Sequence, residues 1–386
     1  MTNDKILFVD QSGQLGGAEL CLADLARHYG PRAAVLLLAD GPFAEQLRNQ
    51  RIKVEILPLP GSLARLTKKA SPLQAVSALP SAAGHLLAIR REFSGAGVIY
   101  LNTAKALLYG AAANFLSSRP AIFHLHDLLS PKHFSAMNIR LMVGAANRMQ
   151  AVIANSQATA DSFVAAGGRV KTHVIPNGFD PQPFDAVTPE EMAIVRQQWN
   201  PGGEPVAAIF GRISRWKGQD VLIRAAAKVP HLVLWIVGDA LFTEDDKAYA
   251  AELRQLAQEL GVAERVHFLG FQDQVTILMR AADIIVHCSV SPEPFGRVLV
   301  EAMLARKPVI AAAAGGPLEI IEHEKTGLLT PPGDTDALAA AIINLVESPT
   351  MRVEMGRHGR VRAESLYGLP VVLAQTDAVI SSVLKT

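Results

Sequence analysis

Two glutamates flank a Phe-Gly pair in the stretch SPEPFGRVLVEAM, residues 291–303. Glu293 follows a predicted strand, and Phe295-Gly296 is expected to start a helix that contains Glu301. The first N–H groups of a helix have no intrahelical acceptor, so this turn favours a bound anion or a sugar hydroxyl. The alternatives are a charge that stabilises a helix N-terminus for Glu293 and a partly buried ion pair for Glu301.

Two cations lie in a second loop that follows a predicted strand. Strand end and loop together read IFGRISRWKGQD. The chain turns at Gly211, and Arg212 and Lys217 lie five residues apart. A helix is expected to begin near Gly218. Two cations and a helix N-terminus in one loop suit a diphosphate. A solvated basic loop is the alternative, and the GxxxxGK[ST] of a Walker A motif is absent.

Glycine-rich loops follow two further predicted strands. The stretch GQLGGAE (13–19) has the spacing G-x-x-G-G instead of the G-x-G-x-x-G of dinucleotide-binding proteins. This spacing argues against nicotinamide binding, although Asp40 follows the next strand, where an NAD site would need an acid. Gly315-Gly316 would let backbone approach a ligand closely, with a tight turn as the alternative.

The stretch FHLHD (123–127) places His124 and His126 on the same side of a strand. A metal site would need further ligands, and no carboxylate pattern supplies them. We therefore predict that His124 is structural, that His126 lies at the edge of the sheet, and that no metal is required. The D-x-D stretch at 334–336 is expected to cap a helix through Asp334.

Short apolar runs alternate with helical patterns, which predicts doubly wound parallel α/β sheets. The runs of the first half are KILFVD, AAVLLLA, VEILPLP, GVIYLN, AIFHLHD, AVIANS and HVIPNGFD. After a Pro- and Gly-rich stretch at 180–205, interpreted as a linker, the pattern restarts with VAAIF, LVLWIVGDA, RVHFLGF, DIIVHCSV and KPVIAA. We expect two Rossmann-like domains, 1–182 and 183–365, that face each other across a cleft, and a C-terminal helix at 366–386. Each motif above follows a strand, which is where such sheets bind ligands.

The composition is typical of a globular cytoplasmic protein. Apolar residues make up 49% and charged residues 19% of the 386 residues, enough for large cores. Cys21 and Cys288 form no metal or disulfide pattern. The N-terminal stretch lacks a secretion signal, and no apolar run reaches the ~18 residues that span a bilayer. Residues 1–182 carry 18 Lys and Arg against 11 Asp and Glu, so the two halves are expected to have different partners.

The segment 62–91 contains cations and apolar residues but no acid. Its cations are Arg65, Lys68, Lys69, Arg90 and Arg91. This composition favours a surface for an anionic membrane or for a lipid diphosphate acceptor. A helix pair with a solvated basic face is an equally good interpretation.

The order and spacing of these motifs resemble the family-4 retaining glycosyltransferases of the GT-B fold. The resemblance covers almost the whole chain and rests on GGAE, HLHD, ANSQAT, IPNGFD, GRISRWKG and SPEPFGRVLVEAM followed by KPVIAAAAGGPLEII. It implies two Rossmann-like domains, a nucleotide sugar held mainly by the second, and a C-terminal helix that returns to the first. It also implies that no metal is needed.

The resemblance assigns donor-binding roles to the second domain. Arg212 and Lys217, after the turn at Gly211, would bind the diphosphate of the donor. Glu301 would hydrogen-bond the ribose hydroxyls. The loop that ends at Phe271 would meet the nucleobase, largely through its backbone.

The resemblance also implies which residues hold the sugar. Glu293 would bind hydroxyls of the transferred sugar, beside the backbone N–H groups of Phe295 and Gly296. His126 would contact the donor sugar near its sixth carbon. The acceptor side, near the phosphates, would be lined by Gly16, Gly17 and Glu19.

These expectations define a retaining hexosyltransferase that uses a nucleotide sugar, UDP-glucose first, and a polysaccharide or lipid-linked saccharide acceptor. Cleavage of the sugar–phosphate bond builds negative charge on the diphosphate, which fixed cations and N–H dipoles stabilise. Because no nucleophile is evident, we expect attack on the same face, with the leaving phosphate accepting the proton of the acceptor. Alternatives are a sugar-nucleotide epimerase or hydrolase, or a nucleotide-sugar-binding protein that has lost catalysis. No nucleic-acid partner is expected, and the location is the cytoplasm, or the inner face of its membrane.

Overall fold

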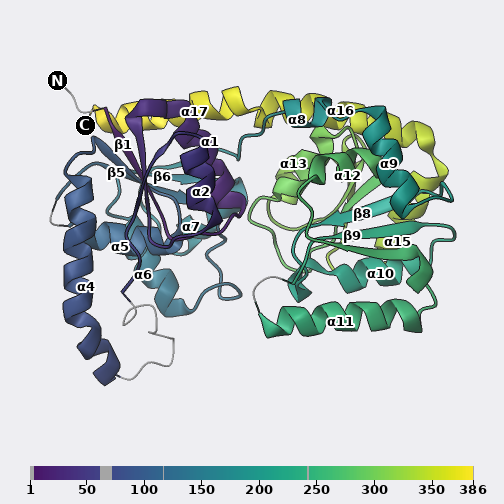
Figure 1. The fold of residues 1–386 in the computed structure, drawn as a ribbon, viewed down its shortest axis with the longest axis horizontal. Helices are drawn as coiled ribbons and strands as arrows, with labels where there is room; N and C mark the ends of the chain where they lie inside the picture. The colour runs from purple at the N-terminus through teal and green to yellow at the C-terminus, as the bar shows by residue number, and fades with distance from the viewer. Residues whose placement is uncertain (1–3, 61–71, 116, 241–242, 386) are drawn as a thin grey trace. The chain divides into compact units, whose positions relative to one another are not determined.

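The chain forms two compact units, each built on one parallel sheet (Figure 1). The computed structural model describes residues 4–60, 72–115, 117–240 and 243–385, with the backbone alone for 72–80. Unit 1 is Met1–Gly178 with Val372–Thr386, and unit 2 is Phe179–Val371. These limits lie a few residues from the expected domain boundaries. The predicted fold class, two doubly wound α/β domains, is confirmed.

The sheet of unit 1 contains every strand that the sequence predicted for this half. In chain order these are β1 (Ile6–Asp10), β2 (Ala33–Leu37), β3 (Lys53–Ile56), β4 (Val98–Leu101), β5 (Ala121–Leu125), β6 (Ala151–Ala154) and β7 (Thr172–Val174). Their order across the sheet is β3-β2-β1-β4-β5-β6-β7. The order reverses between β1 and β4, and ligands of such sheets bind at the carboxyl ends of the strands beside that reversal.

Helices cover both faces of this sheet because alternate strand residues point to opposite sides. They are α1 (Gly17–Tyr29), α2 (Pro42–Asn49), α4 (Pro72–Phe93), α5 (Ala104–Asn114), α6 (Ala136–Ala146) and α7 (Gln157–Ala165), joined by most of α17 (Leu369–Leu384). Ile6 and Phe8 pack with α1, α2 and α17, whereas Leu7 and Val9 pack with α4, α5 and α6. The tail is held to α1 by Asp377, whose carboxylate meets the hydroxyl of Tyr29 at 2.5 Å.

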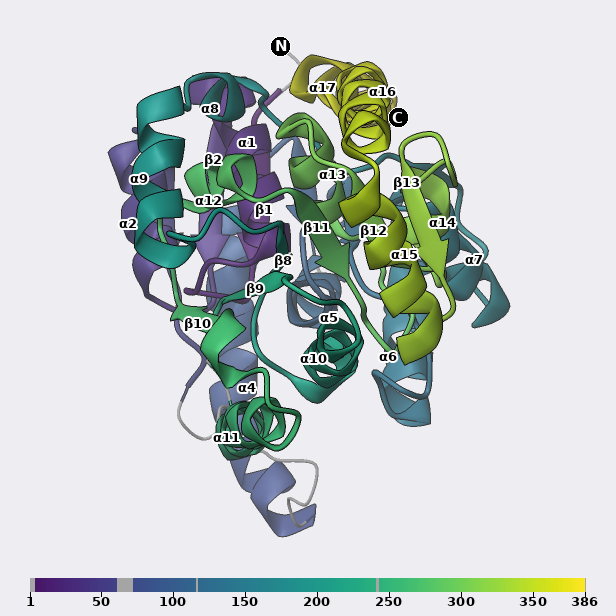
Figure 2. The ribbon, with the colours of Figure 1, turned by 90° about the vertical axis from the view of Figure 1, so that its right-hand side faces the viewer.

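The sheet of unit 2 has one strand more than the sequence predicted. Its strands are β8 (Val206–Phe210), β9 (Val233–Val237), β10 (Val266–Gly270), β11 (Ile284–His287), β12 (Val309–Ala312) and β13 (Gly327–Thr330). Figure 2 shows them across the view in the order β10-β9-β8-β11-β12-β13. The missed strand, β13, is a four-residue edge strand that pairs with β12.

The helices of unit 2 also pack on both faces of their sheet. They are α8 (Gln182–Asp185), α9 (Pro189–Trp199), α10 (Gln219–Ala227), α11 (Glu244–Glu259), α12 (Val275–Ala281), α13 (Arg297–Leu304), α14 (Pro317–Ile320), α15 (Thr335–Glu347) and α16 (Pro349–Tyr367). One face packs on α10, α11 and α15, and the other on α12, α13 and α16. Asp334 caps α15 as predicted, because its carboxylate accepts from the N–H of Ala337.

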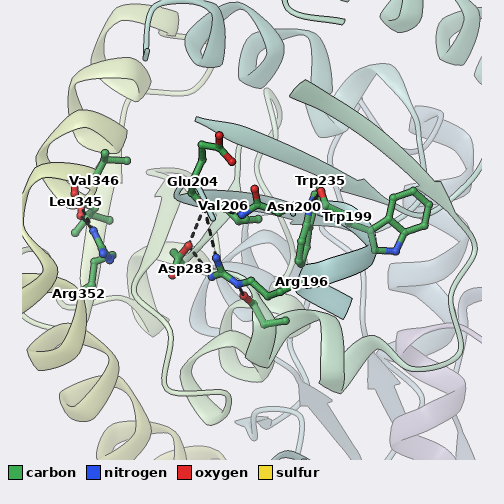
Figure 3. A network of polar contacts seen from close by, with 11 residues as sticks. Arg196, Trp199, Asn200, Glu204, Val206, Trp235, Asp283, Leu345, Val346 and Arg352 are labelled. Atoms are coloured by element: carbon green, nitrogen blue, oxygen red, sulfur yellow. Dashed lines mark hydrogen bonds and ion pairs between the residues drawn. The ribbon is translucent and has the colours of Figure 1, made fainter. Parts of the chain in front are cut away.

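The predicted linker at 180–205 is wrong, because this segment forms α8 and α9. Pro189 occupies the first position of α9, where a missing N–H costs nothing, and Thr188 with Glu191 forms a capping box. Arg196 of α9 then donates to the carboxylate of Asp283 at 2.7 Å (Figure 3). The same Asp283 oxygen accepts from the N–H at the start of β8, so the segment is fixed to the amino-terminal ends of β8 and β11, the two central strands.

Part of the proposed membrane surface lies outside the described residues, namely Arg65, Lys68 and Lys69. Arg90 and Arg91 lie exposed on α4, near its C-terminal end. Among the described residues, no helix has both the length and the apolar character needed to cross a bilayer.

Candidate functional site

The carboxylate of Glu293 lies at the centre of a polar cluster in unit 2. Its side chain is 12% exposed. Both of its oxygens meet the ammonium of Lys217, at 3.2 and 2.9 Å. The oxygen Oε2 also lies 3.1 Å from the imidazole of His287 and accepts from the hydroxyl of Ser289 at 3.1 Å. Of these four contacts three fall on Oε2, so Oε1 keeps more capacity for a ligand hydroxyl.

The cluster keeps Glu293 in its charged form. Burial by itself would raise the pKa of this carboxyl group, but the charge of Lys217 and the contact with His287 bring the pKa well below its usual value. The carboxylate is therefore an acceptor at neutral pH.

The loop of Glu293 is fixed by the glycines at 315 and 316. The N–H of Gly316 donates to the carbonyl oxygen of Glu293 at 2.9 Å. Gly315 has φ +75°, and a Cβ there would lie 2.3 Å from that same oxygen. A Cβ at Gly316 would meet the carbonyl oxygen of Phe295 at 2.3 Å. These glycines therefore make room for the chain's own backbone, as the alternative of a tight turn requires, and their approach to a ligand stays a prediction.

The cation loop is fixed against the end of β11. Lys217 ends a short 3₁₀ turn, and Gly218 follows with φ +71°. A Cβ on Gly218 would lie 2.2 Å from the carbonyl oxygen of Cys288, so the close approach needs glycine. The ring of Trp216 lies below both cations, 4.1 Å from the ammonium of Lys217 and 5.9 Å from the guanidinium of Arg212. The loop thus brings Arg212 and Lys217 to one aromatic side chain.

The Phe-Gly turn and Glu301 have different surroundings. Phe295 is buried, and its ring stacks on Phe179 with centroids 6.3 Å apart. Gly296 immediately precedes α13, as predicted. Glu301, with 24% of its side chain exposed, pairs with Arg297 at 3.6 Å. Burial raises the pKa of Glu301, and Arg297 opposes that rise. Its ion-pair partner is thus on its own helix and is neither of the loop cations.

The remaining donor-side positions lie at the ends of neighbouring strands. Gly211, after β8, donates its N–H to the carbonyl oxygen of Val237 at 3.0 Å. Phe271, after β10, exposes 65% of its side chain. Because β10, β9, β8 and β11 are consecutive in the sheet, these residues and the Lys217–Glu293 pair lie along one edge.

A second polar cluster lies at the strand ends of unit 1. The Nε2 atom of His126 lies 3.0 Å from the amide oxygen of Asn102. The amide nitrogen of Asn102 donates to Asp10 at 2.7 Å. Burial raises the pKa of Asp10 to about 6, and hydrogen bonds from Asn102 and from backbone N–H groups oppose that rise. His124 is buried and lies 2.7 Å from the hydroxyl of Tyr100, as expected for a structural histidine.

Glu19 is a buried residue at the start of α1. Gly16 caps this helix and Gly17 begins it, so Glu19 is in the first turn. Its carboxylate bonds the backbone N–H groups of Gly16 and of Glu19 itself. Burial raises the pKa of Glu19 to about 7, and the charge of Asp10 adds to this rise. In the structure Glu19 therefore caps a helix, and its role on the acceptor side stays a prediction.

The raised pKa of Glu19 predicts a pH-dependent stability. Between about 4.5 and about 7 the folded state binds more protons at this group than the unfolded state, so the free energy of unfolding falls as pH rises. Glu19→Gln keeps the hydrogen bonds without the charge. We expect it to be about 3 kcal/mol more stable than wild type at pH 8, with little difference at pH 4. Urea unfolding at both pH values measures this, and a constant difference would contradict it.

Two family descriptions match consecutive parts of the chain. Residues 15–183 match Glycosyltransferase Family 4, and residues 192–362 match Glycosyl transferases group 1. A crystal structure of HepE from Anabaena in complex with UDP is 42% identical, covers 98% of this chain and 100% of that chain, and superposes with a TM-score of 0.87. The chain belongs to the family-4 glycosyltransferases of the GT-B fold.

Further similar structures and proteins have names that mention UDP-glucose, the lipopolysaccharide core or GDP-mannose. A structure of HepE with UDP-glucose matches with 42% identity, 98% and 99% coverage and a TM-score of 0.87. The lipopolysaccharide core biosynthesis glycosyltransferase LpsE of Rhizobium meliloti is 34% identical over 46% of this chain and 49% of its own length. A GDP-mannose-dependent mannosyltransferase of Corynebacterium glutamicum, which acts on a monoacylated phosphatidylinositol monomannoside, is 32% identical over 59% and 61%. The matches to these two curated relatives thus span about half to three-fifths of their length.

Sequence reasoning did not single out four residues that the structure places in the two polar clusters. They are Asp10, Asn102, His287 and Ser289. Each ends a strand or follows one within two residues, and that position was the signal available in the sequence. No group of three or more His, Cys, Asp or Glu side chains in the described parts of the chain is placed to hold a metal ion.

Proposed function

We propose that this family-4 member transfers a hexose from a nucleotide sugar, with UDP-glucose as the first candidate donor. The observation that carries the proposal is the similarity to HepE, whose structure with UDP-glucose matches 98% of this chain at 42% identity. Such a donor carries a diphosphate beside sugar hydroxyls. The cations of the loop after β8 can bind the diphosphate, and the charged Glu293 after β11 can accept from a hydroxyl.

In this proposal Lys217 serves two parts of the donor. An ammonium has three N–H donors, and in the structure Lys217 directs bonds to the two oxygens of Glu293. A third bond would reach an oxygen of the diphosphate, which Arg212 would also bind. Glu293 would accept a sugar hydroxyl at Oε1. The ribose would meet Glu301, and the base would meet the loop at Phe271.

The proposed reaction retains the configuration of the anomeric carbon. The bond between that carbon and the diphosphate oxygen breaks, and a bond to the acceptor oxygen forms on the same face. The acceptor proton passes to the leaving phosphate, so no protein base is required. Charge that develops on the diphosphate is stabilised by Arg212 and Lys217 without a metal ion. A product with inverted configuration would contradict this step.

We propose a saccharide or a lipid-linked saccharide as the acceptor. Support comes from the named relatives, which act in lipopolysaccharide core synthesis and on a phosphatidylinositol mannoside. An enzyme of this kind would work at the inner face of the cytoplasmic membrane. Contact with anionic lipid through the segment 62–91 stays a prediction, and sedimentation with acidic vesicles would detect it.

A thermal-shift panel of UDP-, GDP- and ADP-sugars tests the donor. A ligand at about 100 times its Kd should add roughly 2.7 kcal/mol to the free energy of unfolding. We expect UDP-glucose to give the largest shift, and a larger shift with a GDP-sugar would overturn this assignment. Donor breakdown without any acceptor would instead favour a hydrolase or epimerase. Binding without any turnover would favour a protein that has lost catalysis.

A further inference from the structure

Three consecutive strands of unit 1 end in polar residues that bond to one another. Asp10 is the last residue of β1, Asn102 directly follows β4, and His126 directly follows β5. These strands are neighbours in the order β1-β4-β5. Asp10 and Asn102 have no exposed surface, so the geometry of their contacts is set within the protein. The row runs from a carboxylate through an amide to an imidazole.

The amide of Asn102 can face only one way in this row. Its Nδ2 lies 2.7 Å from a carboxylate oxygen of Asp10 and 3.1 Å from the carbonyl oxygen of Ala18. Both of these partners are acceptors, so the group that faces them must be the NH₂. The other carboxylate oxygen of Asp10 accepts from the N–H of Ser12 at 2.8 Å, which fixes Asp10 in turn. The amide oxygen of Asn102 is therefore the atom that faces His126.

This orientation determines which ring nitrogen of His126 carries a proton. The amide oxygen lies 3.0 Å from Nε2 of His126 and can only accept, so Nε2 must donate. An imidazolium would donate from the same nitrogen, so Nε2 keeps its proton in either charge state. We propose that Asp10 and Asn102 are positioning residues that hold neutral His126 in the Nε2–H tautomer. Nδ1 is then the unprotonated nitrogen of the neutral ring.

The tautomer defines what His126 can do for a substrate. An unprotonated Nδ1 accepts a hydrogen bond, and a sugar hydroxyl is a group that can donate one. With the opposite tautomer, Nδ1–H would donate, and the lone pair of Nε2 would face the oxygen of Asn102. This part of the inference rests on the proposed function, because it takes the ligand of His126 to be the donor sugar.

Nitrogen-15 NMR of the full-length protein reads the tautomer directly. The resonances of His126 are assigned by their loss in His126→Gln. At a pH where the ring is neutral, we expect the wild type to show Nε2 protonated and Nδ1 unprotonated.

Asn102→Leu removes the acceptor, and we expect a mixture of tautomers. Asn147→Leu is the matched control, because it removes an amide that bonds the backbone of Gly167 and Arg169 at the opposite ends of the strands from His126, and it should leave His126 unchanged. A wild-type spectrum with Nδ1–H would overturn the proposal, and His126→Gln is needed only to assign that spectrum.

Measurements of kcat distinguish a positioning role of Asn102 from a merely structural role. Asn102→Leu should lower kcat for sugar transfer on the order of tenfold, the factor for one lost hydrogen bond, with the affinity for UDP unchanged. Equal spectra and equal kcat in the wild type and Asn102→Leu would overturn the role of Asn102. If the wild type transfers no sugar, the proposed function fails, while the NMR result still decides the tautomer.

Discussion

Lys217→Ala is expected to lower kcat/KM for sugar transfer by about 10²–10³, equivalent to ~2.7–4 kcal/mol of transition-state stabilisation. The reason is the position of the ammonium, which contacts both oxygens of Glu293 and has an 18% exposed side chain. In such a shielded place, charge that develops on the diphosphate is less screened than in open water. Initial rates at subsaturating donor measure the effect.

Arg215→Ala is the matched control for this prediction. Arg215 lies two residues earlier in the same loop, but its guanidinium pairs with Glu252 on an exposed surface. Surface ion pairs contribute little, so rates should stay close to those of the wild type. Equal losses in both variants would mean that the loop responds to any lost cation. An unchanged rate in Lys217→Ala would show that Lys217 does not act on the diphosphate.

Secondary structure was predicted well where apolar runs were long and their borders clear. KILFVD and LVLWIVGDA each contain five consecutive buried strand residues, so both signals were strong. Strand β13 was missed because four residues, GLLT, lie in a segment rich in Gly and Pro. Proline was also misleading at position 189, because Pro189 was interpreted as part of a linker although proline is compatible with the start of a helix. Proline and glycine thus marked boundaries without revealing which element followed.

Some residues of the candidate site could be predicted from one sequence, and others could not. Lys217 and Glu293 were predicted because a parallel sheet collects the loops at the carboxyl ends of its strands. His287 and Asn102 were missed because their importance lies in contacts between different loops and strands, such as the 3.1 Å contact of His287 with Glu293. Such pairings depend on how strands are ordered in the sheet, and one sequence does not contain that order explicitly.

Glu293→Gln should have an equally large effect on transfer, again about 10²–10³ in kcat. Glutamine has the same shape, but its amide cannot accept hydrogen bonds at both terminal atoms. Lys217 and His287 therefore lose hydrogen bonds to a charged carboxylate, and a sugar hydroxyl loses a charged acceptor. The affinity for UDP, which lacks the transferred hexose, should change much less than the affinity for UDP-glucose. Calorimetric titration with both ligands separates these contributions, and an equal loss for both would contradict a role in sugar binding.

The stability of the same variant should depend on pH in a defined direction. Because the folded pKa of Glu293 is depressed, its charge stabilises the fold above the unfolded value of about 4.5, and that contribution is lost as pH falls below this value. The wild type should therefore exceed Glu293→Gln in free energy of unfolding at pH 7, and the difference should shrink at pH 3. Glu252→Gln, which removes one partner of the exposed Arg215 pair, should show little difference at either pH. A gap between the wild type and Glu293→Gln that stays constant with pH would mean that the variant loses packing and not charge, and that Glu293 is not the ionised acceptor on which the sugar contact depends.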